Sequence, residues 1–418
     1  MQVGAVLFLD AREPFDVEAA TDLLAGRVAA TPRLRQRLER VPPGCGRPVW
    51  VDDDRFDLAR HVRQLPCPLP RDRAAVLGVA ATIIAAPLDR ARPLWSATFV
   101  TGLRSDEVAF VVVFHHVMSD GIGGLAVLAN LVDGAPAAAD PLGFPRPAPR
   151  VGPLFVDSLR DRAGSVRRLG ATIRALGGTV AALRRTERTT AARSSLLRPT
   201  GPGRHFELVQ ADVERVHEVA RSHGATVNDV VLVAIGKALR DLSASRGEAI
   251  DRFVMSIPVS SRVTTAAGDL GNHVSVMPIE IRVSDDDGED LAGVAAATQR
   301  AKRSGAPAST ALLGPLFRLL ARLHLLRWFV DHQHMVHTFV TNLRGPTERF
   351  RLGSHEVTEV AAISLITGNV TVAFAVLSYA GTLTVTIVSD PAAVPDVAVL
   401  RDALDRHLCS ITDLAEAR

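Results

Sequence analysis

Two adjacent histidines, His115 and His116, are the side chains in this sequence best suited to proton transfer. They end the apolar, β-branched run 108–114, and Asp120, Gly121 and a helical pattern follow them. An imidazole titrates near about pH 6.5, so it can take a proton from a hydroxyl group and return it to a leaving group. Because successive strand residues face opposite sides, we predict that one imidazole faces a cavity and the other packs or hydrogen-bonds.

The whole pattern HHxxxDG, from His115 to Gly121, is a more specific signal than either histidine alone. A single histidine at a strand end is more often structural than catalytic. The full pattern is expected by chance on the order of once in 10³ chains of this length and ordinary composition. Its position between a strand and a helix favours function further. The sequence contains no GxSxG elbow, which argues against a serine hydrolase.

The elements that position the histidines can be predicted from hydrophobic periodicity and turn residues. A strand at 96–100, entered through Pro93, Leu94 and Trp95, is expected to pair with the histidine strand, with Trp95 in the core. The first half is also expected to contain a strand at 3–9, a helix at 15–30 capped by Asp16, a helix-like segment at 31–41 started by Thr31 and Pro32, a surface turn at Asp52–Asp54, a helix at 73–86 and a helix at 122–131.

A change in composition after the histidine motif predicts the division of the chain. Residues 135–153 are rich in proline, alanine and glycine, which is typical of a linker. We predict an N-terminal subdomain at 1–150, a linker and crossover helix at 151–203, and a C-terminal subdomain at 204–418. The last part is expected to contain strands at 205–210, 253–262, 271–283 and 339–346, a hairpin of 370–378 with 382–388, helices at 213–223, 224–240, 315–330 and 396–408, and an acidic surface loop at 285–290.

Bulk composition limits the classes of protein that this chain can form. Hydrophobic residues make up 47% and charged residues 22%, as in a globular protein. Three unpatterned cysteines favour a reducing compartment, and we expect a cytoplasmic protein without a signal peptide or membrane span. The positive charge is almost all arginine, which leaves open a GC-rich genome or contact with phosphate or anionic lipid. Aromatic residues are only 5% and do not alternate with arginine clusters, so nucleic-acid binding is not expected.

The helical stretch 315–330 and the histidines after it allow two functional readings. The helix carries arginines among leucines and either lies on a membrane surface or faces the core. His332, His334 and His337 have spacing that a metal site can use, but no acidic or cysteine ligand pairs with them. We therefore predict no metal site.

The histidine motif resembles the signature of the coenzyme A-dependent acyltransferase superfamily, and the rest of the chain narrows the resemblance. The segments that carry it are PLDRARPLW before the histidine strand, ATVNDVVL, PVSSR, the strand opened by Gly271-Asn272, TNLRGP and LSYAGTLTVTIVSD. In this order they resemble the wax ester synthase/diacylglycerol acyltransferase family over nearly the whole chain.

The sequence departs from the family pattern in three places, and these departures bear on the choice of acceptor substrate more than on the reaction itself. The family usually begins with a further short segment carrying a Pro-x-Asp or Pro-Leu-Asp motif, and this sequence starts after it. Ile281-Arg282 stand where Leu-Pro usually ends the Gly-Asn strand, and Leu343-Arg344 replace Val-Pro in the usual Asn-Val-Pro-Gly-Pro turn. The HHxxxDG motif is intact, so the sequence supports the chemistry of the family. The departures leave open which acceptor the protein uses.

The resemblance implies a fold and residue roles. It implies an α/β (α+β) fold of two chloramphenicol-acetyltransferase-like subdomains, each a mixed sheet flanked by helices, with a tunnel between them. It implies that His116 is the general base, with His115 beside it. By similarity to condensation domains, Asp120 forms a structural ion pair with Arg35; the alternative is that Arg35 belongs to a solvated basic face. Gly121 allows close passage of the backbone.

The donor for the tetrahedral oxyanion is not identified by any motif. Asn272 and Asn228 are candidate oxyanion or substrate contacts, although helix capping or a turn role is the commoner use of asparagine at such positions.

Three functions follow from these observations. The first is an O-acyltransferase that uses acyl-CoA as a co-substrate, without a permanently bound cofactor, and an alcohol or diacylglycerol-like acceptor. The second is an acyltransferase of specialised metabolism that uses an acyl carrier protein thioester or an amine acceptor. The third is a non-catalytic lipid-binding relative. For each, a peripheral position at a membrane or lipid surface is an open alternative.

Overall fold

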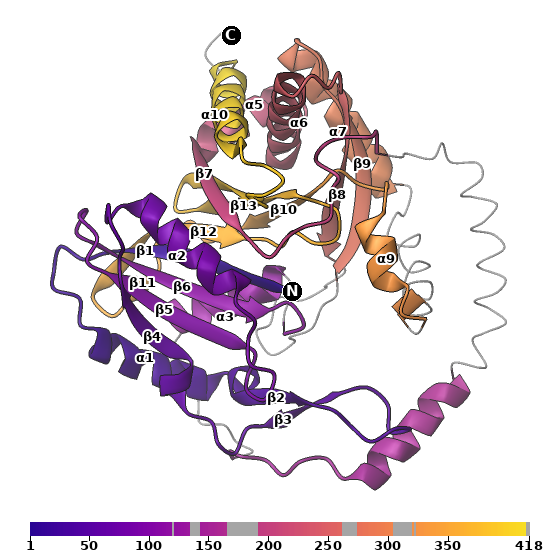
Figure 1. The fold of residues 1–418 in the computed structure, drawn as a ribbon. Helices are drawn as coiled ribbons and strands as arrows, with labels where there is room; N and C mark the ends of the chain where they lie inside the picture. The colour runs from indigo at the N-terminus through magenta and orange to yellow at the C-terminus, as the bar shows by residue number, and fades with distance from the viewer. Residues whose placement is uncertain are drawn as a thin grey trace.

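Two six-stranded sheets organise the chain. The computed structural model describes residues 1–118, 121–133, 143–164, 191–260, 274–303, 320–321 and 323–414. The first sheet has the order β11-β12-β1-β6-β5-β4, and the second has the order β7-β14-β13-β10-β8-β9. In Figure 1 the first sheet and its helices lie below the second sheet and its helices.

The first sheet is mixed, and β1 lies at its centre. It is built from β1 (Gln2–Asp10), β4 (Val62–Pro66), β5 (Trp95–Thr101), β6 (Glu107–His115), β11 (Arg351–Leu352) and β12 (His355–Ile363). Strand β1 pairs antiparallel with both β6 and β12, whereas β4 and β5 are parallel. Residues of β1 alternate between faces: Leu7 packs with α1 (Val17–Ala30) and α3 (Gly121–Asp133), and Phe8 packs with α2 (Arg73–Ala85).

The second sheet is also mixed and carries the larger set of helices. Its strands are β7 (His205–Asp212), β8 (Arg252–Ser260), β9 (Val274–Arg282), β10 (Thr338–Arg344), β13 (Val372–Tyr379) and β14 (Thr382–Ser389). Strand β10 is parallel to β8 and β13, and the other pairs are antiparallel. The hydrophobic core here joins the sheet to α5 (Val213–Ser222), α6 (Val227–Ser245), α7 (Asp287–Arg303) and α10 (Val397–Asp413).

Strand β12 connects the two halves. It comes from the second half of the sequence, yet it completes the first sheet beside β1, with Ile363 opposite Gly4. Residues 351–363 therefore cross the boundary that the sequence predicts at 204. The three-part division itself stays a prediction.

Most predicted elements are confirmed. The strand before the histidines pairs with β5, and Trp95 is 2% exposed and donates its indole N–H to the Leu34 carbonyl. Asp16 caps α1 through the backbone N–H groups of Glu18 and Ala19. The predicted hairpin of β13 and β14 turns at Ala380 and Gly381, which both have positive φ.

Two predictions in the first half are wrong, and a third is right only in part. The segment after Thr31 forms a short 3₁₀ turn, η1 (Pro32–Arg35), and then β2 (Gln36–Glu39), which pairs with β3 (Val49–Asp52). The Thr31 hydroxyl closes α1 by donating to the Arg27 carbonyl and does not cap a new helix. Of the predicted surface turn at Asp52–Asp54, Asp54 does lie in an exposed turn, whereas Asp52 ends β3 and its side chain is 2% exposed and ion-paired with Arg146.

The acidic stretch 285–290 is also not a plain surface loop. Asp287 begins α7, and Asp290 is buried and forms an ion pair with Lys237 on α6. Of the predicted helix 315–330, the described part contains residues 320–321 and the short α9 (Leu326–Asp331). Among the helices of the described residues, none combines the length and hydropathy needed to cross a membrane.

Candidate active site

His116 is the first residue beyond β6, and backbone hydrogen bonds hold it beside the start of β1. Its N–H donates to the Met1 carbonyl at 3.0 Å. The preceding N–H, of His115, donates to the Leu94 carbonyl at 2.9 Å. A turn closed by Met118 N–H on the His115 carbonyl then leads toward α3, which begins at Gly121. His116 therefore lies just beyond the C-terminal end of a strand that is paired on both sides, with β1 and with β5.

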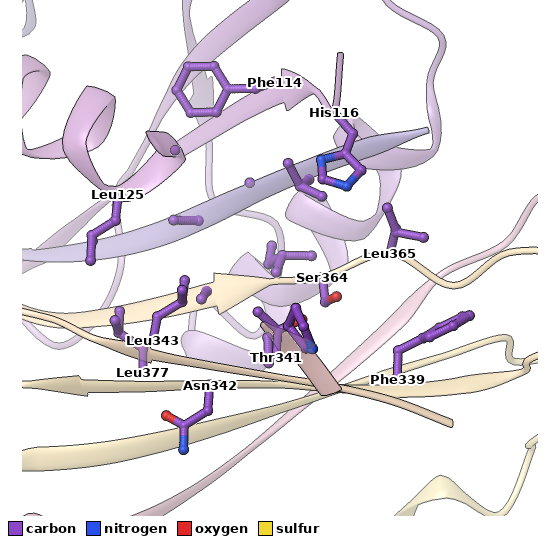
Figure 2. A pocket seen from close by; sticks show the side chains of 18 of the residues that line it. Phe114, His116, Leu125, Phe339, Thr341, Asn342, Leu343, Ser364, Leu365 and Leu377 are labelled. Atoms are coloured by element: carbon purple, nitrogen blue, oxygen red, sulfur yellow. The ribbon is translucent and has the colours of Figure 1, made fainter. Parts of the chain in front are cut away.

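The two imidazoles occupy different environments, as the strand alternation predicts. The His116 side chain lines a cavity between the two sheets, and Figure 2 shows its ring directed into that space. The His115 ring does not line this cavity. Its Nδ1 accepts a hydrogen bond from Val117 N–H at 3.2 Å, and burial lowers the pKa of His115.

The cavity is largely apolar and is built by both halves of the chain. Its volume is about 350 Å³, which lies at the lower end of small-molecule sites. The first half of the fold contributes β1, β6, β12 and α3, and the second sheet contributes β8, β10 and β13. The apolar lining consists of Met1, Val3, Ala5, Phe114, Leu125, Leu128, Pro258, Phe339, Leu343, Val360, Ala362, Ile363, Leu365, Ala375 and Leu377.

A few polar side chains interrupt this lining, and the sequence did not single them out. They are Ser256 on β8, Thr341 and Asn342 on β10, and Ser364 and Thr367 just after β12. In Figure 2, Ser364 and Thr341 lie across the cavity from His116. Thr341 belongs to the TNLRGP segment, so the alternation of that strand is a signal that could have indicated it. Ser364 offers no such local signal.

Arg35 is buried in the same half of the chain as the histidines and does not lie on a solvated face. It is 7% exposed, and its guanidinium lies over the Phe144 ring at 4.0 Å. The alternative of a solvated basic face is therefore wrong for Arg35. Asp120 lies outside the described residues, so the predicted ion pair between Arg35 and Asp120 stays a prediction. Gly121 is at the N-terminus of α3, as expected for the turn into the helix.

Of the two candidate asparagines, Asn228 is described by the structure and does not line the cavity. Asn228 is in the first turn of α6, where Thr226 and Asp229 form the capping box. Its Oδ1 accepts a hydrogen bond at 3.3 Å from Nδ2 of Asn342, which does line the cavity. Asn228 thus contacts a cavity residue and not the cavity itself. Asn272 lies outside the described residues.

Of the three histidines after α9, His337 is buried and hydrogen-bonded to the backbone. His337 is 1% exposed; its Nδ1 accepts from Val254 N–H at 2.9 Å, and its Nε2 contacts the Ala192 carbonyl at 3.2 Å. Burial lowers the pKa of His337 to about 4. No set of three or more histidine, cysteine or carboxylate ligands comes together in the part of the chain that the structure describes.

The arrangement places one imidazole in a hydrocarbon-lined cavity with a few hydroxyl groups opposite it. Such a site can hold an apolar chain and move a proton at one point along it.

Family models and relatives account for the whole chain. The catalytic-domain model of wax ester synthase/diacylglycerol acyltransferases matches residues 1–231, and the C-terminal-domain model of the same enzymes matches residues 270–412. A Mycobacterium tuberculosis protein named probable diacylglycerol O-acyltransferase is 28% identical over 442 residues, covering 100% of this chain and 92% of that protein. A second protein of that species, named for the same activity, is 30% identical over 90% of this chain and 84% of its own length.

Solved structures show the same fold. The wax ester synthase/diacylglycerol acyltransferase of Marinobacter aquaeolei VT8 matches with a TM-score of 0.72 at 20% identity, covering 100% of this chain and 95% of that chain. The first condensation domain of the calcium-dependent antibiotic synthetase matches with a TM-score of 0.65 at 17% identity, covering 99% and 91%. The predicted fold class is confirmed. With both of its domains matched, this chain belongs to the wax ester synthase/diacylglycerol acyltransferase family and is an acyltransferase.

Proposed function

We propose that this acyltransferase moves an acyl group from acyl-CoA to the hydroxyl group of an alcohol or a diacylglycerol-like acceptor, with His116 as the general base. The observation that carries the proposal is the position of His116 in an apolar cavity of about 350 Å³ between the two sheets. Acyl-CoA acts as a co-substrate, and no permanently bound cofactor takes part.

The reaction needs a base because an aliphatic hydroxyl group is a poor nucleophile at neutral pH. The His116 imidazole accepts the hydroxyl proton while the oxygen forms a bond to the thioester carbonyl carbon. When the tetrahedral intermediate collapses, the carbon–sulfur bond breaks and the imidazolium returns the proton to the departing thiolate. The products are an ester and free coenzyme A, and the imidazole is neutral again. No covalent enzyme intermediate is required.

The lining of the cavity supports a hydrocarbon substrate. Apolar side chains from seven strands and helices surround the space, so burial of alkyl chains provides most of the binding free energy, at about 0.8 kcal/mol per methylene. Condensation domains share the fold. The alternative function is therefore acyl transfer from a carrier-protein thioester or to an amine acceptor, and one assay distinguishes it from transfer from acyl-CoA to a hydroxyl group.

The test measures thiol release from acyl-CoA donors of different lengths and from acyl carrier protein thioesters, with long alcohols, diacylglycerol and amines as acceptors. His116→Ala is expected to lower kcat by about 10²–10⁴-fold while the protein stays folded, because the base is lost. The matched control is His217→Ala, at a partly exposed histidine on α5 that is outside the cavity.

Two results would contradict the proposal. Turnover that survives His116→Ala would refute the assignment of the base. Stoichiometric retention of lipid without turnover by any donor, carrier-protein thioesters included, would identify a lipid-binding protein instead.

We also propose that α9 and the residues just before it, 323–325, bring the protein to a lipid surface. Trp328 is 63% exposed, Leu323 57% and Leu325 47%, beside an exposed Arg327. Val330 of α9 packs on Gly368, which follows the cavity residue Thr367. Trp328→Ser and Leu325→Ser together should reduce flotation with anionic phosphatidylglycerol vesicles without changing the melting temperature. Equal flotation of variant and wild type would refute this role.

A further inference from the structure

Helix α3, which follows the histidine turn, begins with an unusual number of glycines. Gly121, Gly123 and Gly124 all lie in its first turn. Glycine destabilises a helix relative to alanine, because it loses more backbone freedom on folding. A glycine inside a helix therefore needs a reason, such as a positive φ or a close approach by another group.

Neither reason applies at Gly124. A Cβ atom added there would meet nothing within 4 Å, and its φ is not in the left-handed region. Gly4, which lines the same cavity, is different: its Cβ would lie 2.3 Å from the Val112 carbonyl oxygen. Sheet packing thus forbids a side chain at Gly4, whereas at Gly124 the space is open.

The open space at Gly124 belongs to the cavity that holds His116. Gly124 lines this cavity together with its helix neighbours Leu125 and Leu128. Figure 2 shows Leu125, Leu343 and Leu377 grouped at one end of the cavity, with His116 toward the other. This end contains hydrocarbon from α3, β10 and β13, so it suits the tail of a substrate whose reacting carbon lies at the histidine.

We propose that Gly124 is a specificity-determining residue, because the missing side chain leaves room for the far end of a linear alkyl chain. A side chain at this position occupies the same volume as the chain terminus. This inference rests on the proposed function and adds to it the residue that limits the length of the alkyl chain. The alkyl chain belongs either to the acyl donor or to the alcohol, and the experiment distinguishes the two.

The size of the effect follows from the burial of methylene groups. Each methylene transferred from water into an apolar site improves binding by about fourfold. Because interiors are close-packed, each carbon added at Gly124 displaces roughly one carbon of the substrate tail. Gly124→Ala should therefore shorten the preferred chain by about one carbon, and Gly124→Leu by about three or four.

The experiment compares kcat/KM across saturated acyl-CoA donors of increasing length with one fixed alcohol, and then across alcohols with one fixed donor. In one of the two series, the ratio of long-chain to short-chain kcat/KM should fall in the order wild type, Gly124→Ala, Gly124→Leu, by at least tenfold for leucine. The series that responds identifies the substrate whose tail lies against α3. The matched control is Gly78→Leu, at an exposed helical glycine of α2 that also has nothing within 4 Å and lies outside the cavity.

A binding measurement separates failure of this inference from failure of the proposed function. Displacement of a fluorescent fatty acid by saturated fatty acids and alcohols of increasing length reports the cavity without turnover. The length dependence should shift in Gly124→Leu and not in Gly78→Leu, whether or not the protein is catalytically active. An unchanged length dependence in both assays, with Gly124→Leu folded by circular dichroism, would overturn the inference.

Discussion

At the scale of single residues, the two neighbouring histidines have separate tasks. His116 reaches the cavity, whereas His115 accepts a hydrogen bond from Val117 N–H in the turn that carries His116 toward α3. We propose that His115 is a positioning residue. Its replacement affects the rate only through the placement of the neighbouring imidazole.

This role predicts a difference between two His115 variants. His115→Ala removes the acceptor and should lower kcat by about tenfold with little change in KM, which corresponds to the loss of one hydrogen bond. His115→Asn keeps an acceptor oxygen and should recover most of the rate. Steady-state kinetics on purified variants measures both. If alanine is as harmful here as at His116 and asparagine gives no recovery, His115 contacts the substrate directly.

His337 makes the stability of the fold depend on pH. Its folded pKa of about 4 is below the unfolded value of about 6.5, so the unfolded state binds the proton first as the pH falls. The contribution of neutral His337 to the free energy of unfolding is therefore fully present above about pH 6.5, and it decreases as the pH falls toward 4. Between pH 7 and pH 5 we expect a loss of about 2 kcal/mol from this group.

Urea unfolding at several pH values tests this expectation. His337→Gln retains an acceptor for Val254 N–H and a donor for the Ala192 carbonyl, and it should lose this part of the pH dependence. The exposed His324, whose positive φ suits asparagine, provides His324→Asn as the control. An unchanged slope in His337→Gln would show that other groups are responsible.

At the scale of elements, a buried ion pair attaches residues 143–150 to the β2–β3 hairpin. Arg146 donates two side-chain hydrogen bonds and one backbone hydrogen bond to Asp52, and these contacts lower the pKa of the Asp52 carboxyl group. A depressed carboxyl pKa contributes stability above the unfolded value of about 4, and this contribution is lost as the pH falls.

A double-mutant cycle on this pair should give a clear coupling energy. Asp52→Ala and Arg146→Ala are expected to couple by about 1–3 kcal/mol at pH 7, because the carboxylate is 2% exposed and accepts two side-chain hydrogen bonds from Arg146. The exposed pair Arg160–Asp157 should couple by less than about 0.5 kcal/mol. Equal coupling in the two cycles would show that burial of Asp52 adds nothing.

The errors in the predicted elements have a common physical origin. The segment after Thr31 has local signals for a helix, but pairing of β2 with β3 outweighs them. The Asp52 side chain is almost fully covered because it pairs with Arg146, and local patterns missed this pairing because Arg146 lies 94 positions away. Local patterns found the histidine strand, the caps and the hairpin. They could not identify partners that only the folded chain brings together.

At the scale of the whole molecule, Arg73 connects three distant elements. It begins α2 and forms ion pairs with Glu107 on β6 and Glu359 on the crossing strand β12. Glu359 is 6% exposed, and its burial raises the pKa of the carboxyl group. The cluster thus fixes the strand that carries Val360, Ala362 and Ile363 into the cavity wall.

Removal of the arginine should destabilise the fold in a pH-dependent manner. Arg73→Met leaves two carboxylates without their partner and should cost about 2–3 kcal/mol at pH 8, since Arg73 itself is 43% exposed. The loss should be smaller at pH 5, because Arg73 lowers the pKa of Glu359 and its removal raises that pKa further, so protonation of Glu359 stabilises the variant more than the wild type. Glu359→Gln in the same chain should recover part of it. Chemical unfolding at both pH values measures these differences; equal losses at pH 5 and pH 8 would contradict the assignment.

Strand β12 also determines when the first sheet can be completed during synthesis of the chain. While the ribosome is still making residues before 355, β1 is paired on one side by β6 and presents its other edge to solvent. That edge belongs to a run of buried apolar residues, Ala5 to Leu9. Some 350 residues of synthesis therefore separate β1 from the strand that covers its open edge, and until that strand is made the edge is available for pairing with other chains.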